Sequence, residues 1–455
     1  MNINKVTAAL VGLGVVSMAG IAQANTVIYI TGSTAARSTI YNLCTTTNLL
    51  FTGKATVVEP TSGSSGSSNQ IVYEGTVAGI TGTVDLSCDF TGSEAGIAST
   101  AGQNLTQSLS DDPNGSGPYP LPGVGSLASF YQPNGTGGWN APAALSTGVF
   151  PDLSMADTSQ AVSITPDSGS TALTDYGVVG IVPFTFVKGY EKTPDGPYTR
   201  VSNITTATFN QCLVDGNAIN AYFLTGNTND TTDGIDIVGR NEGSGTRVNG
   251  LLNAAQYGIA VGVNQYALNS GYPSSPASAQ GVLTFGAQNG TATTYTSPYS
   301  QAVVELAVGN DGYDSGGGVG ECMNADSTGL GSIPVGYLGI SDAQKAVTDG
   351  NGGSAGGDAV PLTFNGVYES DEAVESGQYT YWGQEHLLGQ HGQSAGSNAG
   401  ILATGLASNL AKYEGAVLGQ ATGNISTSAS TQSPIIPVSL MDVARSADAG
   451  FPEQK

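Results

Sequence analysis

The sequence predicts an α/β protein built as two lobes. The chain twice repeats one unit, in which a β-rich run leads through a Gly/Ser/Thr turn into a segment of helical periodicity, once at 27–43 and once at 235–258. With 455 residues, the chain is also longer than a single hydrophobic core ordinarily supports. Two such turns suggest that two helix N-termini face each other across a cleft between the lobes.

The second turn holds the most informative stretch, Arg-Asn-Glu-Gly-Ser-Gly-Thr-Arg at 240–247. A helix that begins at such a turn presents free backbone N–H groups and the positive end of its dipole, which together suit a bound oxyanion. The hydroxyl groups of Ser244 and Thr246 add donors, and Arg240 and Arg247 add charge. On the local sequence, a capped helix with two surface arginines is an equally weighted alternative.

The placement of the arginines favours the binding interpretation. The chain has five of them, Arg37, Arg200, Arg240, Arg247 and Arg445. Two flank the turn at 240–247 and a third follows the turn at 31–34. A chain so poor in cations that keeps them beside Gly/Ser/Thr turns is expected to use them there.

Three further polar positions are candidate ligand contacts, each with an ordinary structural alternative. Ser33 and Thr34 stand in the first turn, where either could serve only as a helix N-cap. Asp157 follows a predicted strand at 152–156 and could equally cap a helix. The Gly/Ser run at 61–68 suits a flexible linker as well as a ligand loop.

The composition argues against several classes of partner. The chain carries 35 acidic and 12 basic residues, for a net charge of −23, which disfavours nucleic acid and anionic membranes. It contains no Gly-Lys-Ser/Thr of a nucleotide-phosphate loop and no cysteine pair at zinc-site spacing. We therefore expect no metal and no cofactor.

The first 24 residues have the features of a secretory signal peptide. Lys5 supplies the positive charge, an apolar run covers 6–19, and Ala22-Gln23-Ala24 forms a small-x-small cleavage site. No later segment is apolar enough for a transmembrane span. The sequence predicts a periplasmic or secreted protein with no membrane insertion after cleavage.

The four cysteines, in an exported chain, predict two disulfides. Three pairings are possible. We favour Cys44–Cys88 and Cys212–Cys322, because each pair would then lie within one lobe.

Two long apolar runs, at 178–187 and 333–340, are predicted to carry the chain between the lobes. Lobe one would comprise 25–182 and 341–455, and lobe two 183–340. Regions rich in Gly, Pro, Ser and Asn at about 91–150 and 266–298 are predicted to be irregular insertions, one in each lobe.

With these pieces in order, the chain resembles the periplasmic phosphate-binding proteins of ABC importers. The family's phosphate loop, Arg-x-Asp-Gly-Ser-Gly-Thr, is matched at 240–246 with Glu242 in place of Asp. Weaker matches are Gly-Ser-Thr at 32–34, Gly-Ser-Ser-Gly at 63–66, the Asp-rich pattern at 152–157, Val-Gly-Tyr at 335–337 and the aromatic segment at 379–382. The chain departs from the family in Ala35, where Phe is usual, in its two insertions and in its acidity.

The resemblance implies a two-lobed type II periplasmic binding protein with its ligand in the cleft between the lobes. The implied ligand-binding residues are Ser33, Thr34, Ala35, Ser65, Asp157, Arg240, Ser244, Gly245 and Thr246. Asp157 can only accept a hydrogen bond, so it suits an oxyanion that still carries a proton, as phosphate does and sulfate does not.

The resemblance implies that the protein is a monomeric, exported solute-binding protein that captures inorganic phosphate for an ABC permease. It is not expected to be an enzyme. One alternative is a secreted structural or surface protein that retains the fold. Another is a serine hydrolase or phosphatase using Ser244, which lacks a Gly-x-Ser-x-Gly elbow and has only His386 and His391 as bases.

Overall fold

The computed structural model describes residues 25–60, 68–102, 108–109, 119–120, 128–146, 149–165, 167–216, 219–241, 243–259, 263–268, 293–296, 303–309, 312–313, 315–348, 357–412, 435–448 and 450–455. The predicted signal peptide at 1–24, Ser65 and Glu242 lie outside the described residues, as does most of the predicted insertion at 266–298.

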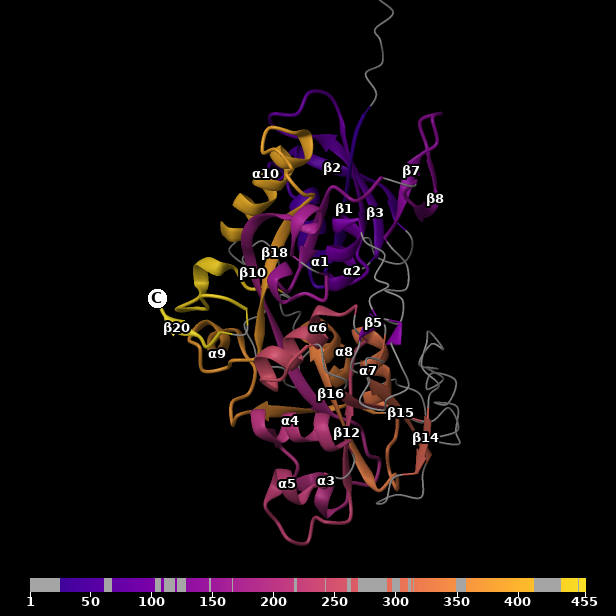
Figure 1. Ribbon diagram of the computed structural model, residues 1–455, viewed down its shortest axis with the longest axis vertical. Coiled ribbons are helices and arrows are strands. Elements are labelled where there is room, and N and C mark those ends of the chain that lie inside the picture. The colour runs from indigo at the N-terminus through magenta and orange to yellow at the C-terminus, as the bar shows by residue number, and fades with distance from the viewer. Residues whose placement is uncertain are drawn as a thin grey trace, which may run out of the picture.

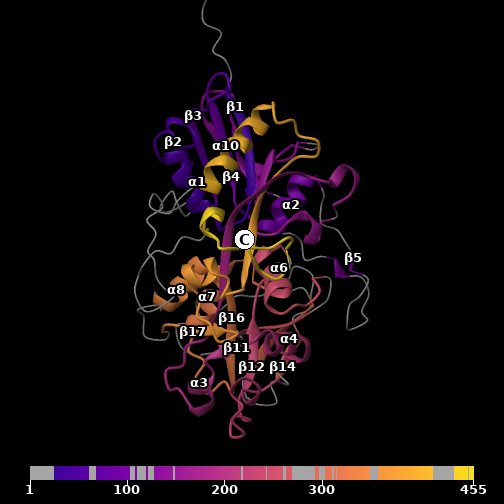
Figure 2. The same cartoon turned by 90° about the vertical axis from the view of Figure 1, so that its left-hand side faces the viewer.

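One mixed sheet of eleven strands runs through both lobes of an elongated molecule (Figures 1 and 2). In order across the sheet, the main path is β11 (Asn203–Ile204), β17 (Val360–Phe364), β10 (Thr174–Lys188), β18 (Trp382–Gly389), β9 (Leu153–Ala156), β1 (Thr26–Gly32), β4 (Val84–Asp89), β3 (Gln70–Thr76) and β2 (Thr52–Pro60). Beside this path, β16 (Ser332–Gly339) pairs with β10, and β12 (Gly234–Val238) pairs with β16.

Strand β10 belongs to both lobes. Its residues from Thr174 to Pro183 pair antiparallel with β18, and its residues from Phe184 to Lys188 pair with β16. The change of partner lies where the first crossing was predicted. Because β17 still pairs with the second half of β10, strand pairing favours a return at β18 rather than at residue 341. The lobe boundaries stay a prediction.

In the first lobe, helices cover a sheet in which β1 pairs parallel with both β4 and β9. These helices are α1 (Ala36–Thr45), α2 (Ser93–Ala101) and α10 (Asn398–Lys412) (Figure 1). The alternation of β1 sends Ile28 and Ile30 into the same hydrophobic core as Ile40 and Leu43 of α1. The strand and helix predicted at 27–43 are confirmed.

In the second lobe, helices surround the parallel pair of β12 and β16. They are α3 (Gly196–Arg200), α4 (Thr206–Asp215), α5 (Tyr222–Thr225), α6 (Gly245–Asn249) with a following π-helical turn (Gly250–Ala254), α7 (Gly316–Asn324) and α8 (Ile340–Thr348). Side-chain caps begin several of them: Thr205 forms a capping box at α4, and Ser244 and Ser315 cap α6 and α7.

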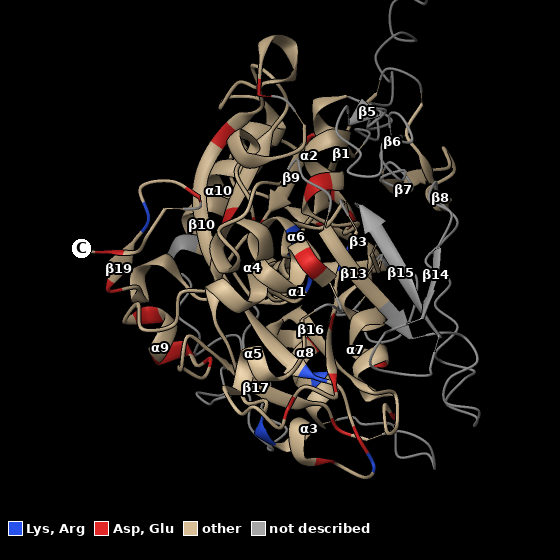
Figure 3. Cartoon of the chain, turned by 60° about the horizontal axis from the view of Figure 1, so that its bottom comes forward, with Lys and Arg blue, Asp and Glu red and all other residues tan. Residues whose placement is uncertain are grey.

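The remaining elements are short or peripheral. They are α9 (Asp371–Glu375), the strands β5 (Ser108–Leu109), β6 (Tyr119–Pro120), β7 (Ser129–Pro133), β8 (Trp139–Ala144), β13 (Val263–Leu268), β14 (Thr293–Thr296), β15 (Val303–Gly309), β19 (Val443–Ala444) and β20 (Glu453–Gln454), and the 3-10 turns Gln160–Val162, Gly169–Thr171 and Val438–Leu440. Acidic residues are spread over both lobes, with few Lys or Arg among them (Figure 3).

The prediction that 91–150 is an irregular insertion is wrong at its start. Residues 93–101 form α2, and eight of its nine residues are buried. The helix was missed because it is built from Ser, Gly and Ala, which give little hydrophobic periodicity. Those small residues allow the helix to lie against the backbone of β1, since a Cβ on Gly96 would stand 2.5 Å from the Cα of Gly32.

Neither predicted disulfide is present. No disulfide joins the four buried cysteines, Cys44, Cys88, Cys212 and Cys322. Cys212 and Cys322 belong to different hydrophobic clusters, one beneath α4 and the other beneath α7, so the proposed bridge would have to cross the packed sheet. The thiols serve instead as small core side chains.

Candidate functional site

Asp157 lies immediately after β9 at the junction of the two lobes. Asp157 is 4% exposed, and its backbone N–H donates to the Ser93 hydroxyl at 3.2 Å. The carboxyl oxygen Oδ1 has no hydrogen-bond partner among the described residues. Burial raises the pKa of Asp157 to about 6, against the opposing effects of Ser93 and the Arg240 charge. The site therefore contains a buried acceptor that is still unsatisfied.

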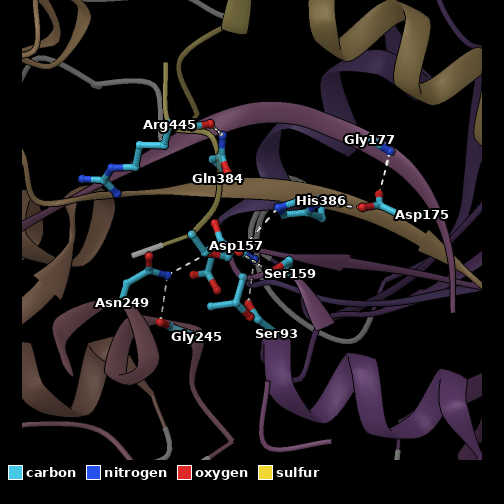
Figure 4. A network of polar contacts seen from close by, with 12 residues as sticks. Ser93, Asp157, Ser159, Asp175, Gly177, Gly245, Asn249, Gln384, His386 and Arg445 are labelled. Atoms are coloured by element: carbon cyan, nitrogen blue, oxygen red, sulfur yellow. Dashed lines mark hydrogen bonds and ion pairs between the residues drawn. The ribbon is translucent and has the colours of Figure 1, made fainter. Parts of the chain in front are cut away.

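The start of α6 meets Asp157 from the second lobe (Figure 4). A Cβ on Gly245 would stand 1.5 Å from Oδ1 of Asp157, so this approach requires glycine. Asn249 fixes the contact, because its side-chain amide donates to the Asp157 carbonyl oxygen at 2.7 Å and to the Gly245 carbonyl oxygen at 3.0 Å. Ser244 is buried and caps the helix, accepting from the Arg247 backbone N–H.

Arg240 is held in place by a buried network behind the same turn. Its Nε donates to the Tyr313 carbonyl oxygen at 3.0 Å, and its backbone N–H donates to the Tyr337 hydroxyl at 3.2 Å. Nη1 of Arg247, a residue only 2% exposed, donates to the Arg240 carbonyl oxygen. Arg247 thus positions Arg240, whose charge acts on Asp157.

Ser33 reaches the junction from the end of β1. Its backbone N–H is already engaged, donating to the Met155 carbonyl oxygen at 2.7 Å. Its hydroxyl is buried and has no hydrogen-bond partner among the described residues. Gly32 makes this turn possible, since its φ is +113° and a Cβ there would strike the Met155 carbonyl. Ser33 can therefore contribute its hydroxyl, not its amide.

The structure gathers part of the predicted residue set in one place. Gly245 lies against the Asp157 carboxyl, and the Arg240 charge acts on the same carboxyl. Thr246 is nearly buried within α6, whereas Thr34 and Ala35 are partly exposed at the start of α1.

Sequence reasoning missed several residues of the junction. Ser93 and Asn249 hold Asp157 by hydrogen bonds, and Glu385 on β18 faces it as a second buried carboxyl. Little in the sequence pointed to Glu385, because it stands in the polar stretch Gln384-Glu385-His386, which is typical of an exposed segment. In the structure this stretch belongs to β18, where Glu385 is buried.

A second polar cluster borders the site on β18. Nδ1 of His386 lies 3.4 Å from an Asp175 carboxyl oxygen, and Nε2 lies 3.7 Å from one of Asp448. The two carboxylates raise the pKa of His386 to about 9, although burial opposes them. Asp448 also accepts from the Ser159 backbone N–H. This cluster ties the C-terminal segment to the first lobe (Figure 4).

Within the described residues, no helix is long and apolar enough to cross a membrane. The same residues contain no group of three or more His, Cys, Asp or Glu side chains arranged to hold a metal ion.

No protein-family model and no curated protein matches the chain. Among solved structures, it is similar to a candidate phosphate ABC transporter substrate-binding protein with bound phosphate from Clostridium perfringens, at 11% identity and a TM-score of 0.38, covering 87% of this chain and 96% of that one. It is similar to an ABC-type phosphate transport receptor from Vibrio cholerae, at 12% identity and a TM-score of 0.37, covering 83% and 93%. PstS from Borrelia burgdorferi matches at 12% identity and a TM-score of 0.33, covering 87% and 96%. At these scores the likeness carries no weight for the ligand.

The α/β architecture has the two lobes that the sequence predicts, joined by one sheet. At their junction, the start of α6 lies against Ser93 at the start of α2 and against Asp157 after β9.

Proposed function

We propose that the protein binds inorganic phosphate at the junction of its lobes, as an exported solute-binding protein for an ABC importer. The chain does not need a catalytic group for this role. His386 is held between Asp175 and Asp448, and the ring of His391 faces the Ala172 carbonyl oxygen, so both rings are engaged with groups other than Ser244.

The buried carboxyl of Asp157 is the observation that carries the proposal. It faces the start of α6 and the Arg240 charge, both of which favour an anion. An acceptor in such a site is compatible with an oxyanion only when the anion supplies a proton to it. Monohydrogen phosphate does so, whereas sulfate would set two acceptors against each other in a dry environment.

The test is competition binding of phosphate and sulfate to ligand-free protein at one pH and one salt concentration. We expect wild-type protein to prefer phosphate by about 100-fold or more, the effect of one unpaired buried polar contact. Asp157→Asn can donate as well as accept, so it should reduce that preference. Arg240→Ala should weaken both anions alike, because its charge does not distinguish them.

Asp152→Asn is the matched control for the Asp157 variant. Asp152 precedes β9, and its carboxylate accepts from the Tyr29 backbone N–H at 2.8 Å, away from α6. This variant should keep the wild-type ratio. Equal binding of the two anions by wild-type protein, or an unchanged ratio in Asp157→Asn, would contradict the proposal.

A further inference from the structure

Glu385 is a second buried carboxyl at the junction, and the strand register places it beside Asp157. His386 pairs with Ala156 in the antiparallel ladder of β18 and β9. One residue further along that register, Glu385 lies across from Asp157, and directly opposed residues in such a ladder project from the same face. Two carboxyl groups thus share one face at the point where the lobes meet.

In the described part of the chain, the Glu385 carboxyl makes no hydrogen bond of ordinary geometry, although the Ser33 hydroxyl acts on it. The residue is 0% exposed, and neither Oε1 nor Oε2 has a hydrogen-bond partner there. The unsatisfied Oδ1 of Asp157 and the unsatisfied hydroxyl of Ser33 belong to the same neighbourhood, since both residues act on Glu385. Three buried polar side chains, at the ends of β1 and β9 and within β18, therefore converge with no hydrogen bond of ordinary geometry at these atoms. Unsatisfied polar groups are costly in a protein interior, so their convergence points to a missing polar occupant.

Burial and the neighbouring Asp157 carboxylate both favour the protonated form of Glu385. Burial raises its pKa well above the usual range, the Asp157 carboxylate raises it further, and the Ser33 hydroxyl and His386 charge oppose these effects. The charged groups that act on Asp157 in turn are Arg240 and Asp448. Glu94, also close to Asp157, is satisfied by Thr158, Ser163 and the Ile164 N–H.

We propose that Glu385 is part of the anion site, and that its carboxyl group stays protonated there and donates a hydrogen bond to the bound oxyanion. This inference rests on the proposed phosphate site. Asp157 and Glu385 then have opposite roles: Asp157 accepts a hydrogen bond from the protonated oxygen of the anion, and Glu385 donates one to an unprotonated oxygen. Ionised Glu385 would instead set a negative charge against the anion.

The consequence is a pH dependence that belongs to the protein rather than to phosphate. In the ligand-free protein, Glu385 loses its proton above a certain pH. Above that pH, phosphate affinity should fall by about tenfold per pH unit, because phosphate binding requires Glu385 to take up a proton again. Glu385→Gln keeps a donor and cannot ionise. It should bind phosphate within about threefold of wild type at pH 6 and escape the decline at higher pH, so the ratio of the two dissociation constants grows with pH. Phosphate's own ionisation cancels in that ratio.

Glu94→Gln is the matched control, since it makes the same change at another fully buried carboxyl near Asp157. It should follow the wild-type pH profile. Glu385→Leu removes the donor and should lower phosphate affinity by about 10- to 100-fold at every pH. A Glu385→Gln profile parallel to that of wild type, with wild type binding phosphate, would overturn this inference and leave the proposed function standing. No phosphate binding by wild-type protein would overturn both.

Wild-type protein provides a second measurement, which serves if Glu385→Gln does not fold. Titration calorimetry with phosphate in two buffers of different ionisation enthalpy gives the number of protons taken up on binding. At pH 9 we expect uptake by the protein in excess of what phosphate itself takes up. Uptake that phosphate alone accounts for, at every pH from 6 to 9, would overturn the inference.

Discussion

At the scale of single residues, the most consequential group outside the anion site is the His386 imidazole. It is nearly buried between the carboxylates of Asp175 and Asp448, which raise its pKa to about 9 from an ordinary value near 6.5. A group whose pKa is raised by folding stabilises the protein fully below its unfolded value, and that stabilisation is lost as the pH rises through the folded value. The relevant window is thus about pH 6.5 to 9.

We expect His386→Gln to be less stable than wild type at pH 6 by on the order of 1–2 kcal/mol, a figure reduced because Asp175 is half exposed. The difference should shrink toward pH 10. Urea unfolding at a series of pH values measures it. His391→Gln, at the exposed histidine, is the control and should track wild type throughout. A His386→Gln deficit that is constant with pH would mean that the ring contributes packing rather than charge.

The sequence could predict the residues whose role is local. The turn at 240–247 could be predicted because its strand, glycines, helix cap and charged residues are contiguous in the sequence. The structure confirms the strand before the turn and the capped helix after it. Glu385 could not be predicted in the same way. Its position depends on which residue of β9 it opposes, and that register is fixed by the packing of distant segments.

At the scale of elements, the contact between α2 and β1 controls how precisely the site is built. Gly96 lies against Gly32, which positions the Ser33 turn, and Ser93 at the start of the same helix holds Asp157. Gly96→Ala should favour the helix slightly and yet destabilise the protein by about 1–3 kcal/mol, because the new methyl group would strike backbone that cannot move aside. Thermal or urea unfolding measures the change.

Gly405→Ala tests the same substitution in α10, where a Cβ would meet only a Leu50 methyl group at an ordinary 3.6 Å. It should be neutral or stabilising by up to about 1 kcal/mol. If both variants behave alike, the close approach of α2 to β1 is not a constraint on the fold.

Element prediction failed where the physical signal was weak. The apolar β-branched runs gave β1, β10, β12 and β16 correctly, since strands buried on both faces are continuous apolar runs. Helix α2 lacks a hydrophobic periodicity of this kind, because its small residues allow a close approach of backbones and contribute little apolar area. The disulfide prediction failed because an even cysteine count carries no geometry.

At the scale of the whole molecule, the C-terminal segment binds the crossing strands together. The guanidinium of Arg445 lies 3.7 Å from the ring centroid of Trp382 and donates to the carbonyl oxygens of Trp382 and Thr380. Ile436, in the same C-terminal segment, forms an antiparallel bridge with Ile181 of β10, the strand next to β18. The chain's end thus holds both β10 and β18 near the point where they pass between lobes (Figure 2).

Arg445→Ala should destabilise the protein by about 2–4 kcal/mol, since it removes a buried stacking contact and the guanidinium hydrogen bonds to two carbonyl oxygens, of which that of Trp382 retains the Asn253 amide. Denaturant unfolding measures this loss. Lys455→Ala removes an exposed cation from the same segment, where Nζ donates to the Val438 carbonyl oxygen, and should cost under about 0.5 kcal/mol. If Arg445→Ala lowers the free energy of unfolding by less than about 1 kcal/mol, the C-terminal segment does not stabilise the crossing strands.

Because β10 pairs with strands of both lobes along one unbroken run of 15 residues, neither lobe is a separable module. Cutting the chain between the lobes would divide a strand rather than a linker and would leave each half with an incomplete sheet. Recombination could therefore not exchange one lobe for that of a relative without also exchanging β10. New specificities in such a protein are expected to arise by substitution at the junction, within a scaffold inherited whole.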